Sequence, residues 1–414
     1  MVIAHHLSPI TRTLSYFAGS TNSLKISNNF TILLDLIAIF LKNYVNKHRI
    51  RIFFAFPDIY SIINDIFFSG FLYFRRRISS KCRNSQMGSE NLSLIDTRKR
   101  ANFRLCNVSG YKMDLLEIHA KDPKFHVLFI PGNPGVISFY LDFLESLYDL
   151  LDGTASVTGK IHNLAHCPNR KGQLVEIPSL CQNWERGRLF SLQEQTDHKI
   201  NFIEHELQDV EVPIVLVGHS IGSYISLDIF KRFQGKVAYC ICLYPFLAVN
   251  TKSSTQSVIK KIAASRTLST GLSSIVAILG LLPVWISRIL VKNSVGKSWC
   301  PAAVEALCSH VLRYHTVQNM LYMAMTEFEK LSEVPDWSFM REKKSQMAFL
   351  FGVDDHWGPL DLYEEISNKV PGAVLAVEKE NFTHAFSCTE AGSLWVAKHV
   401  SGLIKNYFSK IDSE

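Results

Sequence analysis

Short β-rich runs alternate with helix-length amphipathic segments from about residue 104 onward, and this alternation constrains the fold more than any other feature. Runs rich in β-branched and aromatic residues favour strands, whereas apolar residues three or four positions apart favour helices. Strands separated by helices form a largely parallel sheet that helices cover on both faces. The sequence therefore predicts an α/β fold. The predicted strands are residues 126–130, 213–217, 237–244, 346–351 and 374–378.

The alternation stops between the third and fourth predicted strands, which predicts a helical cap at about 247–336 inserted into an α/β domain of residues 100–410. Within the cap, Leu272–Val291 is almost entirely apolar, with Gly280 and Pro283 near its middle. Two interpretations are open. The run forms either a buried helix pair broken at Pro283 or a hairpin that dips into a lipid surface. A transmembrane span is disfavoured by the central proline and by the sheet that continues beyond it. Basic residues that would mark the polar boundary are Lys260, Lys261, Arg288 and Lys292.

Gly218–Gly222 (GHSIG) fits the pattern G-x-S-x-G and stands between a strand-like run and a helix-like run, Ile214–Val217 and Tyr224–Phe233. A strand–turn–helix unit with this pattern is typical of a nucleophile elbow. Glycine is needed at both flanks, Gly218 and Gly222, because a Cβ there would clash with neighbouring backbone. We therefore predict Ser220 as a nucleophile at a helix N-terminus, where the helix dipole stabilises developing negative charge. The alternative is a Gly/Ser turn without catalysis.

A serine nucleophile needs a base and an orienting carboxylate, which follow it in the order Ser, acid, His in this architecture. Such residues are expected just past the C-terminal ends of the last two predicted strands, where parallel sheets place their sites. We predict His384 as the general base, with His219 and His356 as weaker candidates. As the acid, Asp355 is favoured over Asp354, because the loop is expected to turn one carboxylate inward and its neighbour to solvent.

A Gly/Pro-rich loop, residues 131–135 (PGNPG), follows the first predicted strand. Backbone N–H groups in such a position can stabilise an oxyanion that forms when a serine attacks a carbonyl group. We predict the N–H of Asn133 and that of Ile221, the residue after the nucleophile, as the two donors. Pro134 has no N–H, and Pro131 comes too early. The alternative is a purely structural turn.

The net charge of +7 over 414 residues comes entirely from the N-terminal fifth of the chain. Residues 1–86 hold 11 Lys and Arg, 3 Asp and no Glu, whereas residues 87–414 hold 33 basic and 34 acidic residues. Every motif lies in the nearly neutral part, so the charge does not support a nucleic-acid partner. Three interpretations of residues 1–86 are open: a membrane anchor with a basic flank, a targeting extension, or translated upstream sequence ahead of a start at Met87.

The nine cysteines are scattered, and no pair of CxxC motifs predicts a zinc site. Cys240 and Cys242 share an apolar run and are expected on one face of a buried strand. The odd count, in a sequence where we expect no secretory signal peptide, favours a reducing compartment. A glycan on the sequon Asn381–Thr383 would obstruct the predicted base at His384. We therefore expect cytosolic exposure, and the motifs imply no metal or organic cofactor.

These motifs are similar to those of the α/β-hydrolases over residues 104–408 and, more narrowly, resemble the lipid droplet-associated hydrolase family. The motifs that carry the resemblance are Phe129–Gly135 (FIPGNPG) with Phe139 and Tyr140, Gln195–Lys199 (QTDHK) with Phe202 and Ile203, Gly218–Tyr224 (GHSIGSY), Phe351–Pro359 (FGVDDHWGP) and Asn381–Phe386 (NFTHAF). The PGNPG loop, in place of the HG-type loop of many lipases, is the most specific. The resemblance implies a triad of Ser220, Asp355 and His384, and an apolar cap that targets the protein to lipid droplets. Residues 1–86 lie outside the family pattern.

From these observations we expect a serine hydrolase of lipid esters, such as sterol esters or acylglycerols. Its expected partner is a lipid droplet monolayer or membrane surface that it meets through Leu272–Val291. Its expected location is the lipid droplet and the endoplasmic reticulum membrane, on the cytosolic face. A lipid-droplet surface or scaffold protein with slow or vestigial hydrolase activity is the main alternative. A soluble esterase or thioesterase for small substrates is a third.

Overall fold

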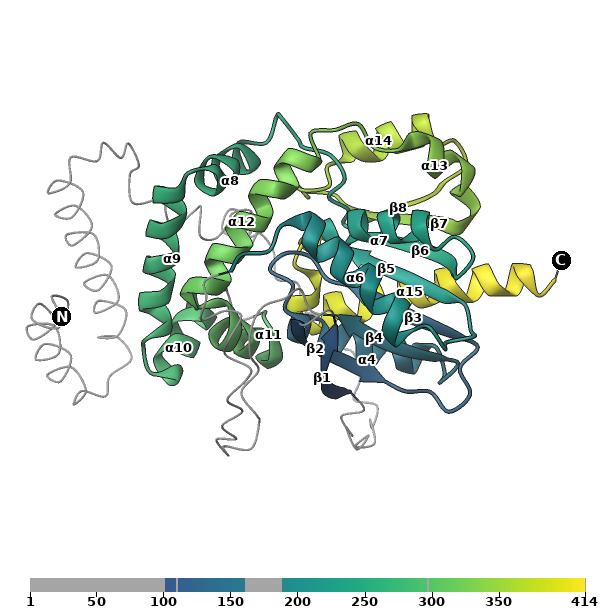
Figure 1. The fold of residues 1–414 in the computed structure, drawn as a ribbon, viewed down its shortest axis with the longest axis horizontal. Coiled ribbons are helices and arrows are strands. Elements are labelled where there is room, and N and C mark those ends of the chain that lie inside the picture. Colours follow the sequence, from purple (N-terminus) through teal and green to yellow (C-terminus); the bar gives the residue numbers. More distant parts are fainter. Residues whose placement is uncertain (1–100, 109–110, 161–187, 296–297, 414) are drawn as a thin grey trace, which may run out of the picture. The chain divides into compact units, whose positions relative to one another are not determined.

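The computed structural model describes residues 101–413 apart from 109–110, 161–187 and 296–297 (Figure 1). The interpretations of residues 1–86 lie outside the described residues, as do the cysteines at 82, 167 and 181.

In the described residues, eight strands form one sheet in the order β1-β2-β4-β3-β5-β6-β7-β8. Their bounds are β1 Asn102–Val108, β2 Tyr111–Ile118, β3 Phe125–Ile130, β4 Ala155–Lys160, β5 Ile214–His219, β6 Val237–Leu243, β7 Met347–Gly352 and β8 Val374–Glu378. The five predicted strands are present as β3, β5, β6, β7 and β8, and they pair in parallel. The predicted α/β fold is thus confirmed. The sequence pattern does not predict β1, β2 and β4, of which β2 runs antiparallel to both of the others.

Helices cover both faces of the sheet (Figure 1). They include α4 Leu141–Leu150, α6 Leu192–Glu206, α7 Ile221–Arg232, α14 Leu360–Lys369 and α15 Glu390–Ile411. Side chains of a strand point alternately to opposite faces, and both faces of β3 are apolar. Val127 and Phe129 join one buried cluster with α4 and α15, whereas Leu128 and Ile130 join another with α6, α7 and α14. Cys240 and Cys242 lie together in the second cluster, as predicted.

Between β6 and β7 the described chain contains helices and no strand, which fits the expected cap. The helices are α8 Ser254–Ala264, α9 Arg266–Gly280, α10 Val284–Val295, α11 Pro301–Ala306, a π-helical turn Leu307–Val311, α12 Tyr314–Lys330 and α13 Trp337–Glu342. The cap has a small core of its own, in which side chains of α8 and α9 pack against α12. No single helix of the described residues is long and apolar enough to cross a membrane. Only α8 and α9 together pass that test, and they are bent by 98°.

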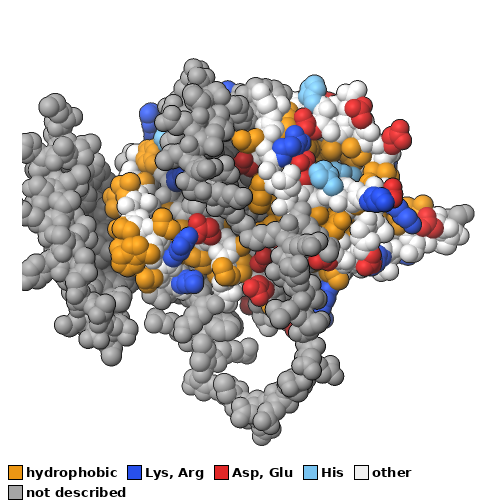
Figure 2. All heavy atoms as spheres, turned by 90° about the horizontal axis from the view of Figure 1, so that it is seen from below, with side chains coloured by type: hydrophobic (Ala, Val, Ile, Leu, Met, Phe, Trp, Pro, Cys, Tyr) orange, Lys and Arg blue, Asp and Glu red, His pale blue; other side chains and the backbone are white. Residues whose placement is uncertain are grey.

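The run Leu272–Val291 breaks at Pro283 as expected, since α9 ends at Gly280 and α10 begins at Val284. One side of the run is buried and includes Leu272, Val276 and Val291. The other side exposes large apolar side chains at the turn between the two helices, with 83% exposure at Leu281 and 64% at Trp285. We call this surface the apolar corner, and it consists of Ile278, Leu281, Val284, Trp285 and Ile289. Figure 2 shows hydrophobic side chains gathered over these helices.

The turn after β5 packs directly against the end of β3. A Cβ on Gly222 would overlap the carbonyl oxygen of Ile130 and stand 2.7 Å from that of Pro131. A Cβ on Gly218 would stand 2.6 Å from the Ser226 Oγ. Gly222 therefore allows the end of β3 to approach the turn closely, whereas Gly218 allows the start of α7 to fold back against the end of β5.

We predict that Gly222→Ala destabilises the protein by about 1–3 kcal/mol, because the added methyl group forces two backbone segments apart. Gly402→Ala in α15 is the matched control, since no atom lies within 4 Å of its added Cβ. The control should be neutral or stabilising by up to ~1 kcal/mol, because alanine favours a helix over glycine. Thermal and urea unfolding of both variants checks this. Equal unfolding midpoints for the two variants would contradict it.

Candidate active site

Ser220 occupies the turn between β5 and α7 in a backbone conformation that residues other than glycine rarely adopt, with φ 56° and ψ −125°. Such a conformation is unfavourable by about 1–3 kcal/mol and persists only where neighbouring structure holds it. Three hydrogen bonds hold it here. The Ser220 N–H donates to the carbonyl of Leu243 (3.0 Å), and the Ser220 carbonyl accepts from the N–H groups of Ser223 (3.0 Å) and Phe246 (3.2 Å). The serine is thereby fixed at the start of α7.

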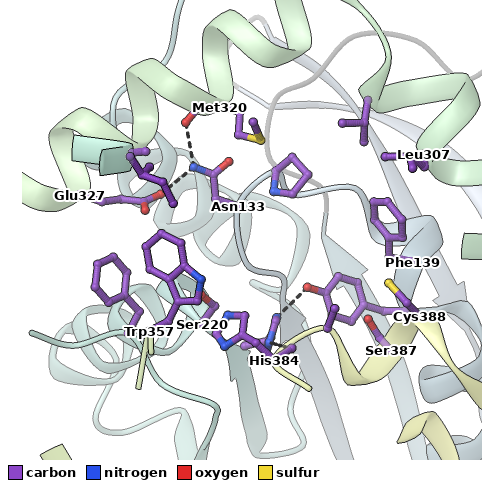
Figure 3. Close-up of a pocket in the computed structure, with 18 of the residues that line it drawn as sticks. Asn133, Phe139, Ser220, Leu307, Met320, Glu327, Trp357, His384, Ser387 and Cys388 are labelled. Carbon is purple, nitrogen blue, oxygen red and sulfur yellow. Dashed lines mark hydrogen bonds between the residues drawn. The ribbon is translucent and has the colours of Figure 1, made fainter. Parts of the chain in front are cut away.

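Ser220 and His384 line the same pocket, which lies between the carboxyl ends of the strands and the cap (Figure 3). Most of the remaining lining is apolar and comes from both sides. The cap contributes Met320 and Leu321 of α12, and the sheet side contributes Phe246 and Trp357. The pocket therefore brings the predicted nucleophile and base into one largely apolar space.

The Nδ1 of His384 lies within hydrogen-bond distance, 2.8 Å, of the Oδ2 of Asp355. The Asp355 side chain is 2% exposed, whereas Asp354 is exposed to solvent. Burial opposes ionisation of Asp355, but the neighbouring His384 and the N–H of Trp357, which donates to Oδ1 (2.9 Å), outweigh it and lower the pKa of this carboxyl. An ionised Asp355 requires the proton of His384 on Nδ1, which leaves Nε2 as the basic nitrogen.

The loop that carries His384 is held at its root by Glu378, the last residue of β8. The buried carboxylate of Glu378 accepts hydrogen bonds from the N–H of Phe382 (2.9 Å) and from that of Glu380. Asn381 between them adopts a positive φ of 62°, which asparagine tolerates better than most residues. These contacts fix where the chain turns back toward the pocket.

His219, a weaker candidate for the base, has partners at both ring nitrogens. Its Nε2 lies 3.0 Å from the carbonyl oxygen of His384, which can only accept, so Nε2 carries the proton. Its Nδ1 therefore accepts from the hydroxyl of Tyr140 (2.8 Å), whose oxygen in turn accepts from the N–H of Gly132 (3.3 Å). Burial holds the pKa of His219 well below its usual value. His219 thus links the segments that carry His384, Tyr140 and Gly132. His356, the other weak candidate, does not line the pocket.

The PGNPG loop lies against the nucleophile. A Cβ on Gly132 would stand 2.9 Å from the Cβ of Ser220, and Asn133 lines the pocket. The backbone N–H groups of Asn133 and Ile221, the predicted oxyanion donors, make no hydrogen bond to any other residue in the part of the chain that the structure describes. The two N–H groups are therefore not engaged by other residues of the described chain, as the prediction requires.

Tyr140 and Glu327 are among the pocket residues for which the sequence analysis predicts no role. Glu327 of α12 is 3% exposed, and its Oε1 accepts from the side-chain Nδ2 of Asn133 (3.1 Å). Burial raises the pKa of Glu327 to about 8, against the opposing effect of the hydrogen bond from Asn133. No group of three or more His, Cys, Asp or Glu residues within the described ranges could hold a metal ion.

A mostly parallel sheet with a serine on a strained turn after β5, and a histidine–aspartate pair after β8 and β7, defines an α/β-hydrolase. The structure resembles that of the epoxide hydrolase VrEH1 from Vigna radiata, with a TM-score of 0.51 and 16% identity over 74% of this chain and 99% of that one. At this identity the similarity establishes the fold alone.

Residues 123–387 match the family described as lipid-droplet associated hydrolase, and the chain belongs to this family. Two curated relatives are both named lipid droplet-associated hydrolase. The Gallus gallus protein is 27% identical over 277 residues, covering 66% of this chain and 83% of its own. The Dictyostelium discoideum protein is 27% identical over 273 residues, covering 63% and 81%. The family membership and the fold together support the conclusion that the protein is a hydrolase.

We predict that Glu327→Gln makes the stability less sensitive to rising pH. The native carboxyl keeps its proton up to a pH near 8, whereas the unfolded chain releases it near 4.5. The native state therefore binds more protons in this interval, so the wild type loses stability as the pH rises through it. Glutamine has no proton to release.

The measurement is the melting temperature at pH 5.5 and 8.5 for the wild type, Glu327→Gln and Glu329→Gln. Glu329 lies on the same helix but is exposed, so its variant controls for the loss of one carboxylate. The fall in melting temperature between the two pH values should be smaller in Glu327→Gln than in the other two proteins. Parallel changes in all three would show that Glu327 is not held protonated.

Proposed function

We propose that the protein is a serine hydrolase of carboxylic esters with Ser220, Asp355 and His384 as its catalytic triad. The observation that carries the proposal is that Ser220 and His384 line the same pocket. The Nδ1 of His384 is paired with the Oδ2 of the buried Asp355 at 2.8 Å. This arrangement leaves the basic Nε2 of His384 for the serine hydroxyl.

In the proposed reaction, the Ser220 Oγ attacks the acyl carbonyl carbon while His384 takes the hydroxyl proton. The backbone N–H groups of Asn133 and Ile221 stabilise the resulting oxyanion. The bond to the alcohol oxygen then breaks, and His384 returns the proton to the departing alcohol. Water repeats the sequence on the acyl-serine and releases the carboxylic acid, with Asp355 stabilising the imidazolium each time.

A lipid substrate is supported by the lining of the pocket. Apart from the catalytic groups, much of the lining consists of apolar side chains, including Phe139, Leu307, Met320 and Trp357 (Figure 3). Such a lining favours an acyl chain or a sterol ring over a charged substrate. We therefore propose neutral lipid esters, such as sterol esters or acylglycerols, as the substrate class.

A lipid droplet surface is supported as the site of action by the apolar corner. Its five large apolar side chains are between 41% and 83% exposed, and Arg288 lies on the same helix as Trp285. Burying such side chains in a monolayer is favourable by about 1.5–3 kcal/mol each, with basic side chains at the polar boundary. The relatives named lipid droplet-associated hydrolase support the same location.

A second candidate function is a lipid-droplet surface protein whose hydrolase activity is slow or vestigial. The apolar corner supports this function equally, because surface binding by itself does not require catalysis. The two functions are distinguished by the turnover of lipid esters that are presented on droplets.

We predict that a fluorophosphonate probe labels the wild type and that Ser220→Ala abolishes labelling, because the probe bonds covalently to an activated serine. Asp355→Asn should slow labelling by about 100-fold or more, since it disturbs the tautomer and charge of His384. Asp354→Asn is the matched control and should label like the wild type, because Asp354 faces solvent. Equal labelling of the wild type and Ser220→Ala would overturn the proposed function. Loss of labelling in Asp354→Asn alone would reassign the acid.

We predict that the double variant Leu281→Ser/Trp285→Ser binds lipid droplets at least about tenfold more weakly, because two large apolar side chains are lost from the contact. Binding is measured by flotation with artificial droplets that have a triacylglycerol core and a phosphatidylcholine monolayer. Val334→Ser is the control, since Val334 is 79% exposed but lies outside the corner. Soluble-ester hydrolysis should be unchanged in both. Undiminished flotation of the double variant would place the lipid-binding surface elsewhere in the chain.

A further inference from the structure

The side chain of Asn133 is held by the cap and not by its own loop. Its Nδ2 donates one hydrogen bond to the main-chain carbonyl of Met320 (2.9 Å) and another to the Oε1 of Glu327 (3.1 Å). Both acceptors belong to α12, as Figure 3 shows. The two N–H bonds of one amide group thus link the PGNPG loop to one helix of the cap.

The orientation of this amide is determined by its partners. The Met320 carbonyl can only accept, so the NH₂ group, and not the oxygen, must face α12. Met320 and Glu327 are seven residues apart, or about two helical turns, and therefore lie on the same face of α12. Because both hydrogen bonds come from the one Nδ2 atom of Asn133, the Glu327 side chain must extend back along α12 toward Met320.

A carboxyl group at the position of Glu327 needs an explanation other than packing. The surrounding pocket residues on α12 are Met320, Leu321 and Ala324, and a buried carboxyl group among apolar side chains is unfavourable unless it is hydrogen-bonded. The protonated form, which burial favours, has a carbonyl oxygen that accepts from Asn133 without placing a negative charge beside a developing oxyanion. A neutral acceptor is therefore compatible with the chemistry of the pocket.

We propose that Glu327 is a positioning residue for the oxyanion site, which holds the Asn133 side chain and thereby the backbone N–H of Asn133. This inference rests on the proposed function. The loop is close to the nucleophile, since a Cβ on Gly132 would stand 2.9 Å from the Ser220 Cβ. A small movement of Asn133 therefore changes the distance between its N–H and the oxyanion on the attacked carbonyl. Because this distance matters most in the transition state, the effect falls on kcat more than on KM.

The test uses the full chain and a short-chain p-nitrophenyl ester, together with the rate of fluorophosphonate labelling. Glu327→Leu replaces the acceptor with an apolar side chain of similar size. It should lower kcat and the labelling rate about tenfold or more. KM should stay within about threefold. Glu327→Gln retains an acceptor oxygen and should keep kcat within about threefold of the wild type. Glu329→Leu is the matched control on the exposed side of α12 and should leave both constants unchanged.

A double-mutant comparison tests whether the two side chains act together. Asn133→Ala removes the side chain but keeps the backbone N–H, and should itself lower kcat. If Glu327 acts through Asn133, then Asn133→Ala/Glu327→Leu should lose little more activity than Asn133→Ala alone, because the contact is already broken. Additive losses in kcat would overturn the inference.

Three further outcomes also test the positioning role of Glu327. An active wild type with an equally active Glu327→Leu overturns the positioning role and leaves the proposed function standing. Equal loss of kcat in the Leu and Gln variants, with a matching fall in melting temperature, shows a purely structural role and also overturns it. A wild type that takes no probe and hydrolyses no ester overturns the proposed function, and the positioning role with it.

Discussion

The strained backbone of Ser220 is the constraint on which the rest of the site depends. Its φ of 56° is maintained by hydrogen bonds to Leu243 and Phe246, which belong to β6 and to the segment that follows it. The same turn is possible only because Gly222 lets the end of β3 approach so closely. The neighbouring strands therefore fix Ser220, and the loop after β3 is placed beside it by the same contact. Strain stored at this point is offset by the buried sheet around it.

The central strands and the groups predicted to be catalytic could be found from the sequence because their signals are local. Each predicted strand is a short apolar run, and each predicted site residue follows such a run within a few residues. Asp355 and His384 meet because β7 and β8 are parallel neighbours, so their carboxyl ends lie at the same edge of the sheet. The expectation that Asp355 turns inward while Asp354 faces solvent needed only the geometry of one tight loop, and the structure places the two carboxylates in this way.

The positions of Tyr140 and Glu327 and the strand β4 could not be predicted in this way, because they depend on contacts between distant segments. Tyr140 is 79 residues from His219, and Glu327 is 194 residues from Asn133. A glutamate on the otherwise apolar face of a cap helix is a signal, but its partner is not predictable from spacing. β4 (ASVTGK) is short and contains Gly159, whose lack of a side chain is needed where Ile137 and Leu144 pack against it. Its pattern therefore resembles a loop more than a buried strand.

The link between Asn133 and α12 has a consequence for how a substrate would enter the pocket. A cap that swung away as a lid would take both acceptors of Asn133 with it. Ser220 and His384 would then stay in place, whereas the PGNPG loop would lose both hydrogen bonds of the Asn133 side chain. If a substrate passed the other cap helices while α12 stayed in place, both hydrogen bonds of the Asn133 side chain would be kept. Substrate entry that preserves this link would therefore require movement of parts of the chain other than α12.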